Sequence, residues 1–424
     1  MSTLYMVLFL AVLPAVAWGQ TGTWQRIESS PQSFDRWDAM SFIHPDTGWI
    51  AGTSGSGMYR TVDGGSTWQR LSVEGDLRAL AFADALTGWL GVLGSNAILR
   101  RTTDGGQTWQ SVSSARDSGA AAVCGVQVLD SRTMMCVGPF SSKLFGKPHF
   151  TRTDDGVTYR TTVLSDKASG LVDVSFRTPA VGLIGGSVGG DLSVGFGIVL
   201  RTVDSGRTWT EVYRSNRPGT QLWKFQRKSD GVIVAAVEGL GSAVPYFVQS
   251  ADDGVTWTEG VISPVRDTIR GLQSIGFVSP NEGWVGGRWF SAMRTLDGGA
   301  TWAYDSTDLW AVNRFQFFGD TLGYAAGSYV YRWRPGVTSV PPHAEGGQGA
   351  DVTVRSNGDD LDVHIHSRFD VRQCFVYDVL GRLVSTQVGT AGRHHYRLPR
   401  NGARGPLFVV VSTTVDYLNA VPAP

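Results

Sequence analysis

Residues 61–68 read Thr-Val-Asp-Gly-Gly-Ser-Thr-Trp, and the pattern Ser/Thr-x-Asp-x-Gly-x-Thr-Trp recurs along the chain. Further copies occupy residues 102–109, 202–209, 250–257 and 295–302. A weaker copy over residues 152–159 keeps Asp154, Gly156 and Thr158 but replaces the first hydroxyl and the tryptophan. A motif that returns every few tens of residues is typical of repeat architectures.

A second column of residues lies upstream of these copies, where an apolar residue is followed six positions later by the start of another apolar stretch. The pairs are Phe42/Gly48, Phe82/Gly88, Phe176/Gly182, Phe225/Gly231, Phe277/Gly283 and Phe317/Gly323, and Val128/Met134 keeps the spacing without Phe and Gly. Neighbouring members lie between 40 and 52 residues apart, which suits a four-stranded blade with variable loops. The column therefore predicts an all-β protein with a seven-bladed β-propeller.

The last repeat is incomplete. Its third strand is predicted over residues 329–333, but Arg334 and Pro335 stand where the motif should begin. At the other end of the chain, Gly22-Thr23-Trp24 looks like the tail of a motif and has no other blade to join. We expect the N-terminal strand to complete the last blade and close the ring, which leaves no free sheet edge.

The residue types of the motif suit a tight turn between two strands. The hydroxyl and the carboxylate can accept backbone N–H groups, Gly supplies a positive φ, and Trp packs between neighbouring sheets. We therefore interpret these positions as structural: Asp63, Trp68, Asp104, Trp109, Asp154, Tyr159, Asp204, Trp209, Asp252, Trp257, Asp297 and Trp302. The Asp residues are too far apart on a ring to share an ion, so we expect neither a metal site nor a cofactor.

These motifs resemble those of the Asp-box (BNR) superfamily, which includes sialidases, sortilin-type receptors, xyloglucan hydrolases and the photosystem II stability/assembly factor family. The last of these is the most similar. Its pattern of Phe-x5-Gly-Trp followed by Arg-Thr-x-Asp-Gly-Gly-x-Thr-Trp is matched over residues 42–68, 82–109 and 277–302. The resemblance covers residues 21–335 and implies the propeller fold, but it says little about function.

The composition excludes some classes of partner. Lys+Arg and Asp+Glu balance at 37 each, so no sequence-wide electrostatic field draws the chain onto nucleic acid or an anionic membrane.

Residues 4–17 form an apolar run of signal-peptide length, and we interpret residues 1–19 as a removed export signal. A retained leader or a cut nearer Gln20 is the alternative. No later stretch has the length and apolarity of a transmembrane helix.

The propeller is accordingly expected over residues 20–335, a Pro- and Gly-rich linker over 336–350, and a small β-sandwich over 351–424. Six short alternating stretches predict its strands: residues 352–354, 361–365, 374–377, 382–388, 395–398 and 407–411.

Within this tail, residues 374–384 read Cys-Phe-Val-Tyr-Asp-Val-Leu-Gly-Arg-Leu-Val and resemble the C-terminal sorting domain of type IX secretion. The resemblance rests on Tyr377, Asp378, Gly381 and Arg382, and it implies the type IX machinery as a partner and a location at the outer surface or outside the cell. That family usually ends in a strand bearing Lys, whereas this chain ends Tyr-Leu-Asn-Ala-Val-Pro-Ala-Pro. An ordinary accessory sandwich is the alternative.

Of the three cysteines, Cys124 and Cys136 are equidistant from Asp130, where a hairpin turn would place them across from each other. A disulfide there and two small buried side chains are both consistent with this spacing.

A propeller brings the residues just before each column member to one face, which makes them candidates for ligand binding. They are Trp37, Asp38, Arg78, Asp173, Trp223, Lys224, Arg270, Trp310 and Arg314. The Arg-Ile-Pro string that a sialidase needs is absent, and Arg26-Ile27-Glu28 is the nearest match.

We therefore expect a non-enzymatic binding or scaffold propeller with an unknown protein or glycan ligand. The alternative is a glycan-cleaving hydrolase, for which Asp38 and Asp173 are the candidate carboxylates.

Overall fold

The computed structural model describes residues 22–113, 119–190, 193–239, 244–262, 271–288, 290–307 and 309–336, together with the strands of the C-terminal tail. The chain divides into two compact units, residues 1–336 and 337–424, each of which is described by itself.

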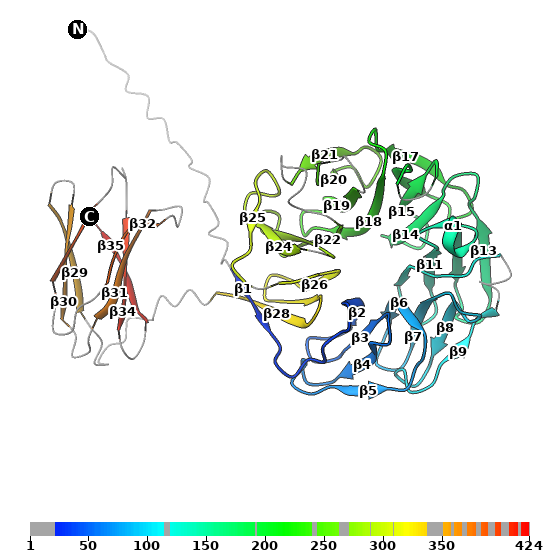
Figure 1. Cartoon of the computed structure of the whole chain (residues 1–424), viewed down its shortest axis with the longest axis horizontal. Helices are drawn as coiled ribbons and strands as arrows, with labels where there is room; N and C mark the ends of the chain where they lie inside the picture. The colour runs from blue at the N-terminus through cyan, green and yellow to red at the C-terminus, as the bar shows by residue number, and fades with distance from the viewer. Residues whose placement is uncertain are drawn as a thin grey trace, which may run out of the picture. The chain divides into compact units, whose positions relative to one another are not determined.

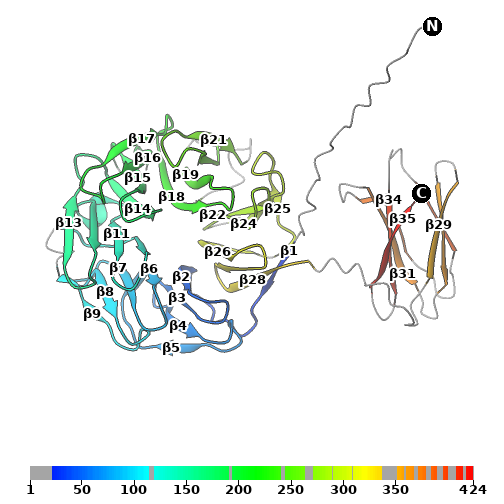
Figure 2. The ribbon, with the colours of Figure 1, turned by 180° about the vertical axis from the view of Figure 1, so that it is seen from behind.

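Seven four-stranded antiparallel sheets form the first unit, and they follow one another around a ring as predicted (Figure 1, Figure 2). Blade 1 contains β2 (Trp37–Phe42), β3 (Gly48–Gly52), β4 (Gly57–Thr61) and β5 (Gln69–Leu71). Blade 2 contains β6 (Asp76–Phe82), β7 (Gly88–Leu93), β8 (Leu99–Thr102) and β9 (Gln110–Ser111). Blade 3 contains β10 (Gly125–Val128), β11 (Met134–Gly138), β12 (His149–Thr153) and β13 (Tyr159–Val163), with the short helix α1 (Ser142–Phe145) between β11 and β12.

The ring continues through three more blades. Blade 4 contains β14 (Gly170–Phe176), β15 (Gly182–Val188), β16 (Phe196–Thr202) and β17 (Thr210–Arg214). Blade 5 contains β18 (Thr220–Arg227), β19 (Ile233–Gly239), β20 (Tyr246–Ser250) and β21 (Thr258–Val261). Blade 6 contains β22 (Leu272–Phe277), β23 (Gly283–Gly287), β24 (Phe290–Thr295) and β25 (Ala303–Tyr304).

Blade 7 is built from both ends of the propeller sequence. It contains β26 (Arg314–Phe318), β27 (Leu322–Ala326), β28 (Val330–Pro335) and, as its outer strand, β1 (Gly22–Arg26). β1 pairs antiparallel with β28, so that Trp24 lies opposite Trp333. The Trp24 ring also meets Trp284 of blade 6 edge-on at 5.4 Å between ring centroids. The predicted closure by the N-terminal strand is confirmed.

The column of apolar residues marks the end of each inner strand. In blade 1, Phe42 pairs across the turn with Gly48, and its ring lies over that glycine. A Cβ at Gly48 would come within 2.3 Å of the Phe42 ring. The same pairing joins Phe82 to Gly88, and a Cβ at Gly88 would meet the Phe82 ring at 2.6 Å. The six-residue spacing therefore reflects a cross-strand pair in which glycine gives the aromatic ring its room.

Blade 5 departs from this register. Phe225 pairs with Ala235, and the cross-strand pair six residues apart is Arg227 with Ile233. The predicted pair Phe225/Gly231 is thus wrong by two residues, because β18 continues two residues beyond Phe225 before the chain turns. Gly231 lies in the turn with a φ of +88°.

The Asp-box motif forms the turn between the third and fourth strands of a blade. In blade 1 the Thr61 hydroxyl donates to Asp63 Oδ1 and accepts the N–H of Gly65, both at 2.8 Å. The Asp63 carboxylate accepts the N–H and the hydroxyl of Thr67 at 2.8 and 2.6 Å. Equivalent bonds hold the turns of Asp104, Asp204, Asp252 and Asp297.

The box tryptophans pack between blades. Trp109 of blade 2 belongs to a core cluster with Met58 and Leu71 of blade 1 and meets Phe82 edge-on at 6.1 Å. Trp68, Trp209, Trp257 and Trp302 likewise join clusters shared with the preceding blade. Each aromatic side chain therefore ties one blade to the next.

The weak box of blade 3 is one residue shorter than predicted. Its first hydroxyl is Thr153, which accepts the N–H of Gly156 at 2.9 Å. Its carboxylate is Asp155, which accepts the N–H of Thr158 at 2.7 Å. The prediction that Asp154 belongs to the box is therefore wrong, since its exposed side chain pairs with Arg152.

The expected opposition of Cys124 and Cys136 is also corrected. Both thiols are free and buried, which favours the reading as small buried side chains. The hairpin pairs Val126 with Cys136 and Val128 with Met134. Its centre lies one residue beyond Asp130, and this offset moves the partner of Cys136 by two residues.

The second unit contains two antiparallel sheets that form a small β-sandwich. The strands are β29 (Asp351–Asn357), β30 (Asp360–His366) and β33 (His395–Pro399) in one sheet, and β31 (Val371–Asp378), β32 (Leu383–Val388), β34 (Leu407–Thr413) and β35 (Tyr417–Ala423) in the other. β35 was not among the predicted strands. Tyr377 and Asp378 end β31, whereas Gly381 and Arg382 lie outside the described residues.

A disulfide across the closing seam should stabilise the whole propeller. Thr23 and Arg334 are exposed and lie opposite each other in the β1–β28 pair. The double variant Thr23→Cys/Arg334→Cys should gain about 2–4 kcal/mol when oxidised, because the bond closes a very long loop. Urea unfolding with and without reductant measures the gain. An oxidised variant that unfolds like its reduced form would contradict closure by β1.

The box carboxylates should make stability depend on acid. Hydrogen bonds from the Thr108 hydroxyl and N–H lower the pKa of Asp104 from 3.8 to about 2. A lowered pKa adds stability that is complete above the unfolded-state pKa and is lost as the pH falls through about 2. Asp104→Asn should therefore melt below the parent at neutral pH, and the difference should shrink toward pH 2. Asp166→Asn, at an exposed position outside any box, is the control.

Candidate functional site

Five inner strands carry a β-bulge near their start. The register shifts fall at Trp37/Ala39, Leu77/Ala79, Leu171/Asp173, Leu222/Phe225 and Leu272/Ser274. A bulge leaves the extra residue out of the ladder and re-aims its side chain. The residues within these bulges are Asp38, Arg78, Val172, Trp223, Lys224 and Gln273.

Four of the bulge residues line one cavity of about 350 Å³, which we call the central cavity. Blades 1, 2, 3, 5 and 6 contribute to it. Its lining residues are Arg36, Asp38, Thr53, Ser54, Asp76, Arg78, Leu93, Phe140, Trp223, Glu238, Gln273 and Arg288. The starts of the inner strands therefore meet at a single polar site.

Asp38 is the hub of this site. Its buried carboxylate accepts bonds from Arg78, from Arg36 Nε at 3.1 Å and from the Thr53 hydroxyl at 2.9 Å. Asn313 of blade 7 donates to the same carboxylate and to the Asp38 carbonyl, both at 3.0 Å. Burial raises the pKa of Asp38, but the charges of Arg78 and Arg36 outweigh burial and leave it below its usual value. Asp38 is therefore a fixed anion that orients two guanidinium groups.

Both arginines keep unused donors. Arg36 and Arg78 are 2% and 5% exposed. Arg36 Nη1 and Arg78 Nε are buried and have no acceptor among the described residues. The Arg78 guanidinium also lies over the Trp223 ring at 5.1 Å. Buried donors without acceptors are costly, so a ligand oxygen at this place would be stabilising.

Glu238 is the second buried acid of the central cavity. Burial raises its pKa to about 7, against a bond from Gln273 Nε2 to Glu238 Oε1 at 2.9 Å. It is therefore only partly ionised near neutral pH, whereas Asp38 is ionised. Among the buried groups of the cavity, the charges of Arg36 and Arg78 therefore exceed those of the two acids.

A buried ion pair joins blades 4 and 5. Lys224 Nζ lies 3.3 Å from Asp173 Oδ1, and Asp173 Oδ2 accepts the N–H of Phe225 at 2.9 Å. Burial and the charge of Arg314 lower the pKa of Lys224 to about 7. Burial likewise lowers the pKa of Arg314 to about 10. These groups set the inner strands in register.

The structure separates the predicted ligand-binding residues into groups. Asp38, Arg78 and Trp223 line the central cavity, and Asp173, Lys224 and Arg314 form the adjoining charged group. Trp37 is fully buried in the core between blades 7 and 1, where its Nε1 donates to the Pro31 carbonyl at 3.1 Å. Trp310 is 45% exposed and does not line the cavity. Arg270 lies outside the described residues.

Sequence reasoning missed several residues of the cavity. Arg36 and Asp76 lie two positions before Asp38 and Arg78, a spacing that places side chains on the same side of a regular strand. That spacing is a usable signal. Glu238 and Gln273 carry no such signal, because they approach each other only across the interface between blades 5 and 6.

Two other kinds of site are absent from the described residues. Within the described ranges, no three His, Cys, Asp or Glu side chains are close enough to hold a metal ion. Helices of sufficient length and apolarity to span a membrane are likewise absent from the part of the chain that the structure describes.

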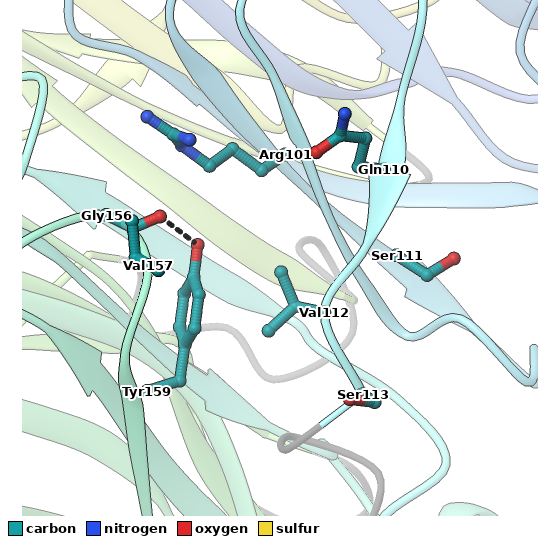
Figure 3. A pocket seen from close by; sticks show the side chains of 8 residues that line it. All are labelled: Arg101, Gln110, Ser111, Val112, Ser113, Gly156, Val157 and Tyr159. Atoms are coloured by element: carbon teal, nitrogen blue, oxygen red, sulfur yellow. Dashed lines mark hydrogen bonds between the residues drawn. The ribbon is translucent and has the colours of Figure 1, made fainter.

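A second cavity, of about 380 Å³, lies beside the short box of blade 3. Figure 3 shows Tyr159 on one wall and Val112 across from it. The Tyr159 hydroxyl donates to the Gly156 carbonyl at 3.2 Å and accepts Trp89 Nε1 at 2.9 Å. Because Tyr replaces Trp in a box that is one residue short, we attribute this space to the packing of the blade.

The closed ring and its box turns define the class: the first unit is a BNR-type β-propeller. The family model described as Photosynthesis system II assembly factor YCF48 matches residues 17–120. No curated protein sequence matches the chain.

Solved structures share the fold. YCF48 bound to a D1 peptide is 21% identical, covers 74% of this chain and 96% of its own, and superposes with a TM-score of 0.52. PorZ, a surface component of the type IX secretion system of Porphyromonas gingivalis, is 14% identical over 92% of this chain and 59% of its own, with a TM-score of 0.55. A GH74 xyloglucanase from Xanthomonas campestris is 15% identical over 81% and 59%, with a TM-score of 0.50. At these identities the likeness is one of fold.

Proposed function

We propose that this chain is an exported, non-enzymatic binding propeller that holds a polypeptide ligand at the central cavity. The observation that carries the proposal is the pair of buried arginines, which Asp38 fixes in place while Arg36 Nη1 and Arg78 Nε remain without acceptors. Preorganised donors of this kind favour a ligand that brings carboxylate or carbonyl oxygens.

Three further features support a polypeptide. Trp223 and Phe140 add aromatic surface to the arginines, with ring centroids 6.4 Å apart, and aromatic and Arg side chains are the usual anchors of protein interfaces. Arg288, which also lines the cavity, adds a partly exposed guanidinium that is paired with Asp35 at 2.5 Å. The similar propeller YCF48 is described as bound to a D1 peptide.

A glycan-cleaving hydrolase is the second candidate. It is favoured by the two buried acids of the central cavity, since Glu238 has a pKa of about 7 and Asp38 is ionised. A protonated acid beside an ionised carboxylate is the arrangement that glycoside hydrolysis uses. Against this role, the Asp38 carboxylate is already occupied by two arginines, a threonine and an asparagine.

For the tail we propose sorting through a type IX route to the outer surface or the medium, after removal of an N-terminal signal. The sequence of residues 374–384 supports this role. PorZ, with which the chain shares its fold, is itself a surface component of such a system.

Peptide selection tests the binding role. Random peptides displayed on phage should yield binders that share acidic residues. Arg288→Glu should weaken them by about tenfold or more and reduce the salt dependence of binding, because it reverses a partly exposed charge that lines the cavity. Arg70→Glu, on the outer strand β5, is the matched control and should bind normally. Release of reducing ends from a polysaccharide, abolished by Glu238→Gln, would instead establish the hydrolase.

Deletion of residues 337–424 tests the sorting role. The truncated chain should fold, since the two units have separate strands, but it should accumulate in the periplasm. Cell fractionation and protease accessibility on intact cells measure its location. Normal surface yield of the truncated chain would contradict the assignment.

A further inference from the structure

The Asp box of blade 5 contains a residue that its turn does not favour. The fourth position of the box has a positive φ, and it is glycine in the boxes of blades 1, 2 and 6. In blade 5 it is Asp253, with a φ of +59°. Residues other than glycine rarely adopt this backbone conformation, although Asp tolerates it better than most. Blade 4 has Ser205 at this position, with a φ of +65°, so Asp253 is distinguished by what its side chain contacts.

Three arginines converge on the Asp253 side chain. Arg177 Nε lies 3.0 Å from Oδ2, Arg227 Nη2 lies 2.7 Å from Oδ1, and Arg201 Nη2 lies 3.9 Å from Oδ2. Arg201 Nε also donates to the Asp253 carbonyl at 3.2 Å. We call these four residues the arginine cluster.

The arginine cluster depends on the irregular register of blade 5. Arg227 occupies the place at the end of the inner strand where blades 1 and 2 have Phe42 and Phe82. Its partner across the turn is Ile233. The repeat would place a core aromatic residue there, so packing alone does not account for a charged side chain.

The charge of the arginine cluster is not balanced. Three guanidinium groups face one carboxylate, which leaves two positive charges, and no other carboxylate lies within 4.0 Å of them in the described ranges. The neighbouring Asp252 is engaged by its own box, where its oxygens accept bonds from Ser250 and Thr256. The surplus charge is therefore available to a ligand.

The cluster is also accessible. The side chains of Arg177 and Arg227 are 49% and 34% exposed, and that of Asp253 is 27% exposed. Each guanidinium has five N–H donors, and only some of them have acceptors here. Arg177 follows the end of β14, and Asp253 lies in a box turn. The cluster thus sits at the opposite ends of the inner strands from the bulge residues of the central cavity.

We propose that the arginine cluster binds a tetrahedral oxyanion, a sulfate or phosphate group, on the Asp-box face of the propeller. Three guanidinium groups from two blades match a tetrahedral anion, whose oxygens point in several directions. A planar carboxylate, in contrast, can be bound by a single guanidinium group. Asp253 holds the three arginines together when the site is empty. The proposal stands independently of the ligand of the central cavity.

Calorimetry on the full chain at low ionic strength tests the site, with sodium sulfate, sodium phosphate and a heparin-derived sulfated hexasaccharide as probes and chloride as the reference. Arg177→Gln and Arg227→Gln should each weaken binding by about tenfold. Arg214→Gln, on β17 of blade 4 and paired with Glu211, is the matched control and should leave binding unchanged. A hexasaccharide that binds far more tightly than free sulfate assigns the anion to a polymer, and equal affinities assign it to a free ion.

Asp253→Gly separates a binding site from a structural latch. Glycine suits the positive φ, and the change removes the carboxylate that competes with the anion, so sulfate or phosphate should bind more tightly. The proposal is overturned if none of the three probes binds, if binding is equal in Arg177→Gln, Arg227→Gln and the parent, or if Asp253→Gly lowers the melting temperature without any gain in anion affinity.

Discussion

The pairing of β1 with β28 joins the two ends of the propeller sequence, and the geometry of the central cavity depends on it. Blade 1 follows β1 in the chain, and at its interface with blade 7 Asn313 donates two hydrogen bonds to Asp38. Asp38 in turn orients Arg36 and Arg78. The central carboxylate is therefore held by side chains from blades 1, 2 and 7, which the closed ring brings together.

The repeats also show where the chain departs from its own rule. In the repeats, a Phe ring lies over a Gly at the end of the inner strand and a Trp packs between blades. These two contacts recur because they pack the ring. Blade 3 shortens its box and uses Tyr159, and a cavity opens beside it. Blade 5 shifts its register and brings Arg227 to the surface beside a strained Asp253. Departures that packing does not require are the places at which function is best sought.

A shared propeller does not determine chemistry, since structures of this fold include both a peptide-bound assembly factor and a xyloglucanase. The side chains of the central cavity support the proposed binding role. A catalytic carboxylate must be free to meet its substrate, whereas Asp38 is saturated by protein donors. Glu238 remains as a single buried acid, and an arginine-rich cavity with spare N–H groups suits recognition better than hydrolysis.

The sequence by itself determined the class of fold, the number of blades and the closing strand, because box turns and the Phe/Gly column are local patterns with a fixed period. It also placed Asp38, Arg78 and Trp223 near one another, since inner strands converge. Only the tertiary structure decided which of the candidates share a cavity: Trp37 is buried elsewhere, while Glu238 and Gln273 meet between blades. The physical reason is the β-bulge, which turns a side chain toward or away from the axis without any change in residue type.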